Sequence, residues 1–228
     1  MLARSLLPVL LILLLPLGVA HAEDLDHEVE VWLPVSAQGD LIDETFGGYI
    51  EVQPRVSREG LDRLLVRPAA YLRVAERLSV WLGYAWTPGF EPVHQDEHRI
   101  WEQFLAEFHL DDLADPSPVL SSRTRLEQRF IESVPDVAVR LRQLIRLQVP
   151  VYELVSAVVW DEVFVNLNDT RGGPRLGFDQ NRLFVGVNLA FVKEVSLDVG
   201  YLNVHQHRGA GEVDLVRHVV MAWLMFRF

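Results

Sequence analysis

Long stretches of this chain alternate apolar and polar residues with a period of two, and this pattern constrains the fold more than any other feature. The clearest stretch is VAVRLRQLIRLQVPV, residues 137–151. One face carries Val137, Val139, Leu141, Ile145, Leu147 and Val149, and the other carries Arg140, Arg142, Arg146 and Gln148. Because successive side chains of a strand point to opposite faces, this period predicts half-buried β-strands.

Eleven segments show this pattern, near residues 27–37, 45–56, 62–75, 77–87, 97–110, 119–132, 136–149, 153–167, 180–192, 195–207 and 214–228. Most are longer than the roughly five or six residues that are usual for a strand. Their connections alternate between tight turns such as VAERLS and long polar loops such as HQHRGAGEVD. Neither a convincing helix nor a linker interrupts the series, so we predict a single all-β domain.

Two architectures share this alternation and differ in what lies outside the barrel. A soluble lipocalin-like barrel turns its apolar face inward, around an apolar ligand. An outer-membrane barrel turns its apolar face toward lipid and its polar face toward the lumen. Strand runs of about 10 residues suit a crossing of the hydrocarbon layer, and alternating short and long connections are typical of its two ends. We predict a transmembrane antiparallel up-and-down β-barrel of about 10 to 12 strands, with the soluble periplasmic barrel as the alternative.

The stretch HVVMAWLMFRF, residues 218–228, adds to this prediction. Alternate positions are occupied by Val220, Ala222, Leu224, Phe226 and Phe228. This aromatic ending resembles the C-terminal signal by which the outer-membrane assembly machinery recognises its substrates, so Phe226 and Phe228 are predicted to serve as that signal. We expect the segment to be the final strand, which closes the barrel against the first.

The first 22 residues, MLARSLLPVLLILLLPLGVAHA, predict a secretory signal peptide. Arg4 supplies an early positive charge, and an apolar run too short for a retained anchor is broken by Pro8 and Pro16. A small-x-small ending predicts a cut after Ala22. The barrel domain would then be residues 23–228, exported to the outer membrane of a Gram-negative bacterium.

Composition argues against several classes of function. The formal net charge is −11 at pH 7, so binding of nucleic acid through its phosphates is not expected. There is no cysteine, which excludes disulfides and thiolate metal sites. The stability of the exported domain must therefore come from packing and hydrogen bonds.

If the aliphatic faces meet lipid, the opposite faces line a narrow lumen with charged side chains. The predicted charge network consists of Arg123, Arg125, Glu127, Arg129, Arg140, Arg142, Arg146, Glu51 and Glu162. Buried charges are costly unless they pair and hydrogen-bond across strands. Such a network either fills and rigidifies the barrel or lines an anion-selective pore. Because about eight strands leave an interior that side chains just fill, we expect a largely plugged lumen with at most low conductance for small solutes.

Catalysis and metal binding have weaker support. Hydrolases of the outer membrane need a nucleophile that a nearby histidine activates, and no serine shares a strand end with a histidine. A lipid hydrolase is therefore the second alternative. His205 and His207 point to one face and are weak candidates for a metal site, but they do not supply a complete ligand set. We predict no enzyme activity, no metal and no cofactor.

Four stretches also resemble a known family. They are HRIWEQ (98–103), SSRTRLEQRF (121–130), WDEVFVNLND (160–169) and NRLFVGVNLAF (181–191). In this order they resemble the bacterial domain-of-unknown-function family 2490, from about Val31 to the end. The resemblance implies an outer-membrane barrel with no established activity. Its expected partners are outer-membrane lipids and lipopolysaccharide, and, during biogenesis, the barrel-assembly machinery and periplasmic chaperones.

Three features conflict with a regular barrel. Eleven segments are an odd number, whereas bacterial single-chain barrels have even numbers of strands. Pro54 and Pro68 fall inside strands, where each removes a donor from the hydrogen-bond ladder. Asp161 and Glu102 fall on the face that is predicted to meet lipid.

Overall fold

The computed structural model describes residues 25–90, 95–111, 113–209 and 211–228, which form twelve strands. These are β1 (Asp26–Trp32), β2 (Val35–Ile42), β3 (Phe46–Ser57), β4 (Gly60–Ala75), β5 (Leu78–Thr87), β6 (Glu97–His109), β7 (Val119–Ile131), β8 (Ala138–Tyr152), β9 (Val155–Asn166), β10 (Gly177–Val192), β11 (Val195–Gln206) and β12 (Leu215–Arg227). The predicted signal peptide lies outside the described residues. Across the described ranges, no helix has the length and apolar character needed to span a membrane.

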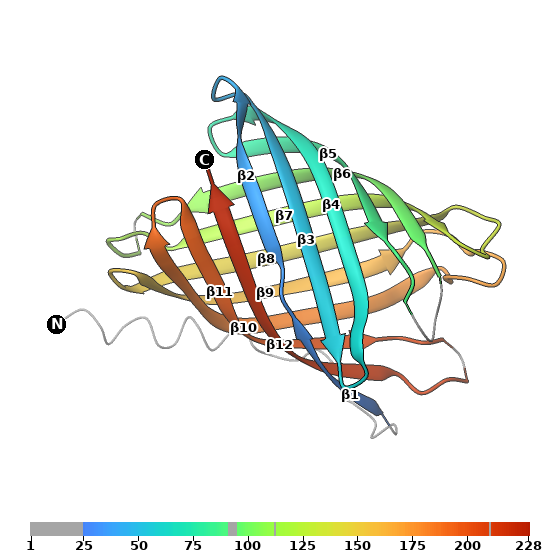
Figure 1. Cartoon of the computed structure of the whole chain (residues 1–228). Coiled ribbons are helices and arrows are strands. Elements are labelled where there is room, and N and C mark those ends of the chain that lie inside the picture. The colour runs from blue at the N-terminus through green and yellow to red at the C-terminus, as the bar shows by residue number, and fades with distance from the viewer. Residues whose placement is uncertain (1–24, 91–94, 112, 210) are drawn as a thin grey trace.

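The strands form one closed sheet, shown in Figure 1. Consecutive strands from β2 to β12 pair antiparallel. β1 and β2 lie end to end and both pair in parallel with β12, with Asp26 opposite Leu215 and Val35 opposite Leu224. They occupy one position, so the barrel has eleven strand positions. The predicted all-β barrel is confirmed, and its last strand closes against its first.

The parallel closure accounts for the odd number of segments. In a series of antiparallel strands, the first and the last run in the same direction when their number is odd, so they can pair only in parallel. β1 therefore starts beside the start of β12, and Asp26 and Arg227 lie at opposite ends of the barrel. An even number of strands is not required for closure.

The break between β1 and β2 accommodates two prolines. The N–H of Leu33 donates to the carbonyl oxygen of Pro54 at 3.0 Å, and the carbonyl oxygen of Pro34 accepts from the N–H of Leu224 at 2.9 Å. At the break between β1 and β2, Pro54 and Pro34 thus contribute only their carbonyl oxygens, as hydrogen-bond acceptors. Pro68 is accommodated by an interruption of the β4–β5 ladder at its position. The predicted conflict is resolved because no ladder needs the missing N–H groups.

The two ends of the barrel carry different connections. One end, called the loop end, carries the connections that follow β3, β5, β7, β9 and β11. The other, called the turn end, carries the connections that follow β2, β4, β6, β8 and β10, together with the C-terminus. In Figure 1 the loops between β7 and β8 and between β9 and β10 lie on the right, whereas the C-terminus and the hairpins that join β8 to β9 and β10 to β11 lie on the left.

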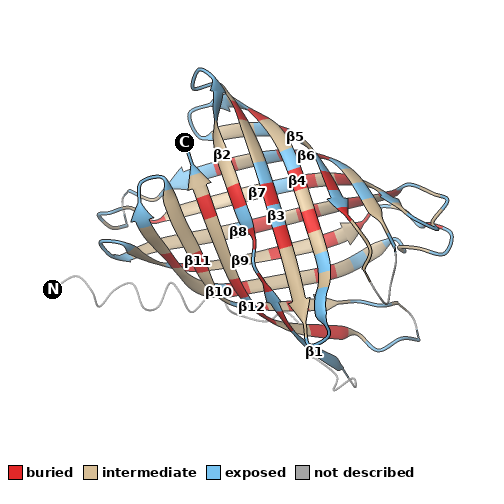
Figure 2. Ribbon diagram, in the orientation of Figure 1, coloured by how far each residue is buried: buried red, intermediate tan, exposed pale blue. Residues whose placement is uncertain are grey.

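Side chains alternate between the lumen and the outer surface along each strand, and Figure 2 shows buried and exposed residues in alternation. On β9 the residues Val158, Trp160, Glu162 and Phe164 are buried, and those between them are not. The outer positions are mostly aliphatic or aromatic. The alternation therefore separates an apolar outside from a polar and aromatic inside.

Aromatic rings fill the lumen above inward-facing glycines. The ring of Trp101 lies against Gly83, and the ring of Phe184 lies over the facing pair Gly186 and Gly200. A Cβ atom at these glycines would overlap the rings, so only glycine allows such close packing. One buried apolar cluster comprises Trp32, Leu144, Val158, Trp160, Phe184, Leu202, Val204, Val219 and Met221. The other comprises Leu65, Tyr71, Trp81, Ala85 and Trp101.

Candidate functional site in the barrel lumen

All nine residues predicted for the charge network occupy inward positions. Six are buried, and Arg123, Arg129 and Arg146 are half-buried. Arg146 on β8 reaches Asp198 on β11 at 2.5 Å, and Arg123 on β7 reaches Glu162 on β9 at 2.6 Å. Because these strands are not neighbours in the sheet, the side chains meet inside the lumen by reaching over the strands that lie between them.

Two glutamates bridged by Arg142 form the centre of the network. Glu127 accepts hydrogen bonds from Arg140 Nη2 and Arg142 Nη1, each at 2.7 Å. Glu162 accepts from Arg142 Nε and Nη2, each at 3.0 Å, and from Arg123 Nη2 at 2.6 Å. Both glutamates are at most 2% exposed. Each carboxylate oxygen of the two glutamates accepts a hydrogen bond from an arginine, and this pairing allows the charges to be buried.

Other members of the network were not predicted. Three further carboxylates pair with predicted arginines: Glu97 with Arg129, Asp179 with Arg140 and Asp198 with Arg146. Asp198 lies in the inward register of β11, so the alternation offered a signal for it. Glu97 is the first residue of β6, and Asp179 lies at a bulge of β10 where the register shifts. Glu97 shares the inward register of Trp101 and Gln103, so the alternation offered a signal for it as well, whereas the bulge interrupts the period of two at Asp179 and leaves no signal for its face.

The lumen holds two connected cavities at the loop end and a separate one at the turn end. The outer cavity at the loop end, called the vestibule, has about 960 Å³, and the inner cavity below it has about 110 Å³. Their linings share Arg63, Thr87, Glu97, Arg129, Asp179 and Gln206. The cavity at the turn end, of about 320 Å³, shares no lining residue with either. The central ion pairs and the apolar clusters fill the space between.

A pair of loop residues beside the vestibule gives a pH-dependent contact. The backbone N–H of Arg171 and its guanidinium Nε and Nη2 donate to the carboxylate of Asp136, at 2.9, 3.0 and 2.9 Å. These hydrogen bonds, first from the side chain and then from the backbone of Arg171, hold the pKa of Asp136 below its usual 3.8. The contact therefore stabilises the loops above pH 3.8 and is lost as the pH falls through the lowered value.

We expect the amide resonance of Arg171 to report this contact in a pH titration by NMR. Its chemical shift should stay constant at neutral pH and change with a midpoint below 3.8. The Asp136→Asn variant should show no such transition. A midpoint at or above 3.8 in the unmodified protein would contradict the assignment.

The histidines considered for a metal site both contact Asp214. His205 Nε2 lies 3.0 Å from Oδ2, and His207 Nδ1 lies 2.9 Å from Oδ1. Burial raises the pKa of Asp214, but hydrogen bonds from the Arg208 N–H and from His207 lower it more, so the net shift is downward. Within the described ranges, no group of three or more His, Asp or Glu side chains is arranged to hold a metal ion.

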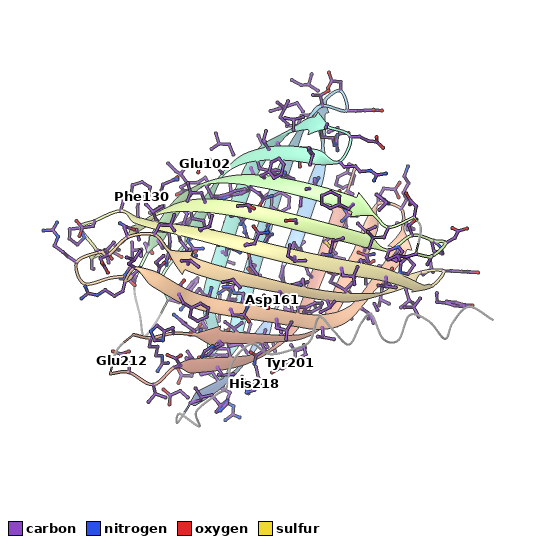
Figure 3. The ribbon with its side chains drawn as sticks, turned by 180° about the vertical axis from the view of Figure 1, so that it is seen from behind. Glu102, Phe130, Asp161, Tyr201, Glu212 and His218 are labelled. Carbon is purple, nitrogen blue, oxygen red and sulfur yellow. The ribbon has the colours of Figure 1, made fainter. Side chains whose placement is uncertain are left out.

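The polar residues on the outer face are hydrogen-bonded to one another. Asn181 Nδ2 donates to both carboxylate oxygens of Asp161, at 2.9 and 3.0 Å, and Gln128 Nε2 donates to Glu102 at 3.0 Å. Figure 3 shows Asp161 and Glu102 on the outside of the barrel wall. Their outward register is as the alternation predicts, and each has a partner on the next strand.

Aromatic side chains gather on the outer face near both ends. Toward the loop end lie the exposed rings of Tyr84, Trp86, Phe130 and Phe178. Toward the turn end lie those of Phe108, Tyr152, Phe191 and Phe228. The predicted assembly-signal residues Phe226 and Phe228 stack with their ring centres 6.5 Å apart. Between the two groups the outer face is mostly aliphatic, with Tyr201, Asp161 and Glu102 among the exceptions.

Comparison with known proteins agrees with the resemblance seen in the sequence. The model of the family described as "Protein of unknown function (DUF2490)" matches residues 29–214. An uncharacterized protein of Methylorubrum extorquens is 31% identical over 220 residues, and the match covers 94% of each chain. No solved structure matches this chain. The protein is therefore a member of the DUF2490 family.

Proposed function

We propose that this protein is a non-enzymatic β-barrel of the outer membrane of a Gram-negative bacterium, with a lumen sealed by its own side chains. The proposal rests on which side chains face outward and which face the lumen. Leu82, Val185 and Val220 point outward with 60, 53 and 54% exposure, while Glu127 and Glu162 are buried inside. A largely apolar outer wall of this kind suits lipid better than water.

The height of the apolar band supports a membrane location. On β6, His98 and Phe108 lie on the outer face about ten residues apart, which at a rise of about 3.4 Å and a tilt of about 40° spans about 25 Å. Outer-membrane barrels have an apolar band of about this height, flanked by aromatic residues. The hydrogen-bonded pairs of Asp161 with Asn181 and of Glu102 with Gln128 also fit, because an unpaired polar group in lipid is costly.

The two alternatives receive less support. A soluble barrel that binds an apolar ligand needs an apolar cavity, whereas the inner cavity of this lumen is lined chiefly by arginines. A hydrolase needs a nucleophile beside its base, and across the described residues no serine hydroxyl is hydrogen-bonded to a histidine. We therefore favour a structural or weakly conducting barrel.

Cell fractionation tests the location. We expect the protein in the outer-membrane fraction, released only by detergent, and with a heat-dependent shift in gel mobility that reports a closed barrel. Contact with lipids and lipopolysaccharide, and delivery by periplasmic chaperones to the barrel-assembly machinery, follow from this location. Recovery in the soluble periplasmic fraction without detergent would contradict the proposal.

Conductance across a planar bilayer tests the seal. We expect no steady open state in the unmodified protein, because the central ion pairs and apolar clusters separate the cavities of the two ends. A stable, water-filled conductance like that of a general porin would show that the lumen is open and would contradict a sealed barrel.

A further inference from the structure

The inner cavity has an unusual excess of positive charge. Its lining includes two carboxylates, Glu97 and Asp179. It also includes nine arginines: Arg55, Arg63, Arg67, Arg99, Arg129, Arg140, Arg142, Arg182 and Arg217. Carboxylates lining the cavity or lying just behind it pair with six of these arginines. In the described part of the chain, Arg55, Arg63 and Arg182 have no carboxylate within 4.0 Å. Arg63 is exposed to solvent, so the half-buried Arg55 and Arg182 supply the two guanidinium charges that face this small space without a carboxylate partner.

Donors without partners line the same space. Arg67 is 8% exposed and Thr87 is 7% exposed. Arg67 Nε, Thr87 Oγ1 and the Nε atoms of Arg55 and Arg182 are buried, and none of them has a hydrogen-bond partner in the described residues. Buried donors of this kind are rare in folded proteins and mark a place where a ligand or a water completes the structure. Water would satisfy the hydrogen bonds but would not balance the charge.

Aromatic rings hold two of the unpaired guanidinium groups in place. The Arg55 guanidinium carbon lies 3.8 Å from the centre of the Trp32 ring, and that of Arg182 lies 5.1 Å from the same centre. Arg182 also lies 4.5 Å from the ring centre of Phe164. These contacts position the guanidinium groups, and among the described residues their one protein acceptor is Gln53 Oε1, 3.4 Å from Arg55 Nη2. The cavity thus presents positioned donors from β3, β4, β5 and β10.

We propose that the inner cavity is a binding site for a phosphate group, as inorganic phosphate or as a phosphate monoester. Arginine matches phosphate oxygens through paired N–H donors, and a dianion balances the two unpaired guanidinium groups of Arg55 and Arg182 better than a monocarboxylate does. The cavity of about 110 Å³ holds one small oxyanion, and the vestibule of about 960 Å³ has room for a group attached to it. The inference goes beyond the proposed role. It depends only on the residues of the lumen, so its test is independent of the membrane location.

Calorimetric titration of the purified protein, folded in a non-ionic detergent, tests the site. Sodium phosphate is added at constant ionic strength, with sodium chloride as the matched titrant. We expect saturable binding of phosphate and a rise of the melting temperature with phosphate concentration, because a ligand that binds only the folded state stabilises it. Absence of saturable binding, or an equal effect of chloride, would overturn the proposal.

Variants of the unpaired arginine distinguish a binding site from a structural role. Arg182→Gln should weaken phosphate binding at least about tenfold. It should also raise the melting temperature without phosphate, because it removes a buried charge that has no partner. If Arg182 had only a structural role, Arg182→Gln would instead lower the melting temperature without phosphate. Arg73→Gln is the matched control, since Arg73 pairs with Asp40 at the turn end, 2.7 Å away, and should leave phosphate affinity unchanged.

A second variant covers the case in which Arg182→Gln does not fold. Thr87→Val keeps the shape of the side chain and removes only the unpartnered hydroxyl. It should fold and weaken phosphate binding severalfold. Unchanged affinity in every variant that folds would overturn the placement of the site.

Glucose 6-phosphate distinguishes the two sources of the phosphate group. Tighter binding of the monoester than of inorganic phosphate would assign the vestibule to the attached group. Binding of inorganic phosphate alone would assign the site to the free anion. Failure of both probes to bind would exclude a phosphate site.

Discussion

Replacing Glu127 with alanine is expected to lower the free energy of unfolding of the barrel by about 3 to 5 kcal/mol. Glu127 is 1% exposed and is the shared acceptor of Arg140 and Arg142. Its loss leaves both guanidinium groups with one carboxylate partner fewer, in a space that already holds excess positive charge. Unfolding by denaturant, followed by tryptophan fluorescence, measures the change.

Matched substitutions separate the effect of burial from that of charge. Glu127→Gln keeps the shape and one acceptor oxygen, so it should destabilise the barrel less than Glu127→Ala. Asp136→Ala also removes the carboxylate of an arginine pair, but that pair is on the surface, with the Arg171 side chain 78% exposed. It should leave the unfolding transition unchanged. Equal effects at positions 127 and 136 would contradict a stabilising role for the lumen network.

Replacing Val185 with arginine is expected to destabilise the barrel by about 2 to 4 kcal/mol when it is folded in lipid vesicles. Val185 lies near the middle of β10, points outward and is 53% exposed. In a membrane this position faces the centre of the hydrocarbon layer, where a guanidinium group is poorly solvated. In water the same substitution at an exposed site would change stability by no more than about 0.5 kcal/mol.

Position along the strand provides the control for this experiment. Val151 is 67% exposed and lies one residue from the turn end of β8, close to the expected membrane interface. Val151→Arg should therefore cost only about 0 to 1 kcal/mol in the same vesicles. A neutral Val185→Arg variant, or equal losses at the two positions, would argue against a membrane-embedded outer wall.

The alternation in the sequence predicted the strands closely because each strand separates two uniform environments. The segment predicted at 180–192 is β10 (Gly177–Val192), and that at 136–149 is β8 (Ala138–Tyr152). Where a bulge shifts the register, as between Phe178 and Gln180, the pattern fails and the strand start is missed. A period is a local property, so it is reliable only where the local register is regular.

The candidate site was predicted only in part. Arg140 and Arg142 were assigned to the lumen from their register, but Asp179, a partner of Arg140, was not. Nothing in the sequence distinguished paired arginines from the unpaired Arg55 and Arg182. Pairing across the lumen depends on which strands lie opposite each other and on their relative stagger. A single strand carries no information about either.

The sequence by itself determined the all-β class, the approximate extent of the strands and the faces on which apolar and charged side chains lie, because these follow from the two-residue period of each strand. Only the tertiary structure decided that eleven strand positions close through a parallel pair, that glutamates neutralise some arginines and not others, and that the remaining arginines meet in one cavity. The physical reason is distance along the chain: Asp26 and Leu215 become neighbours only when the whole sheet closes.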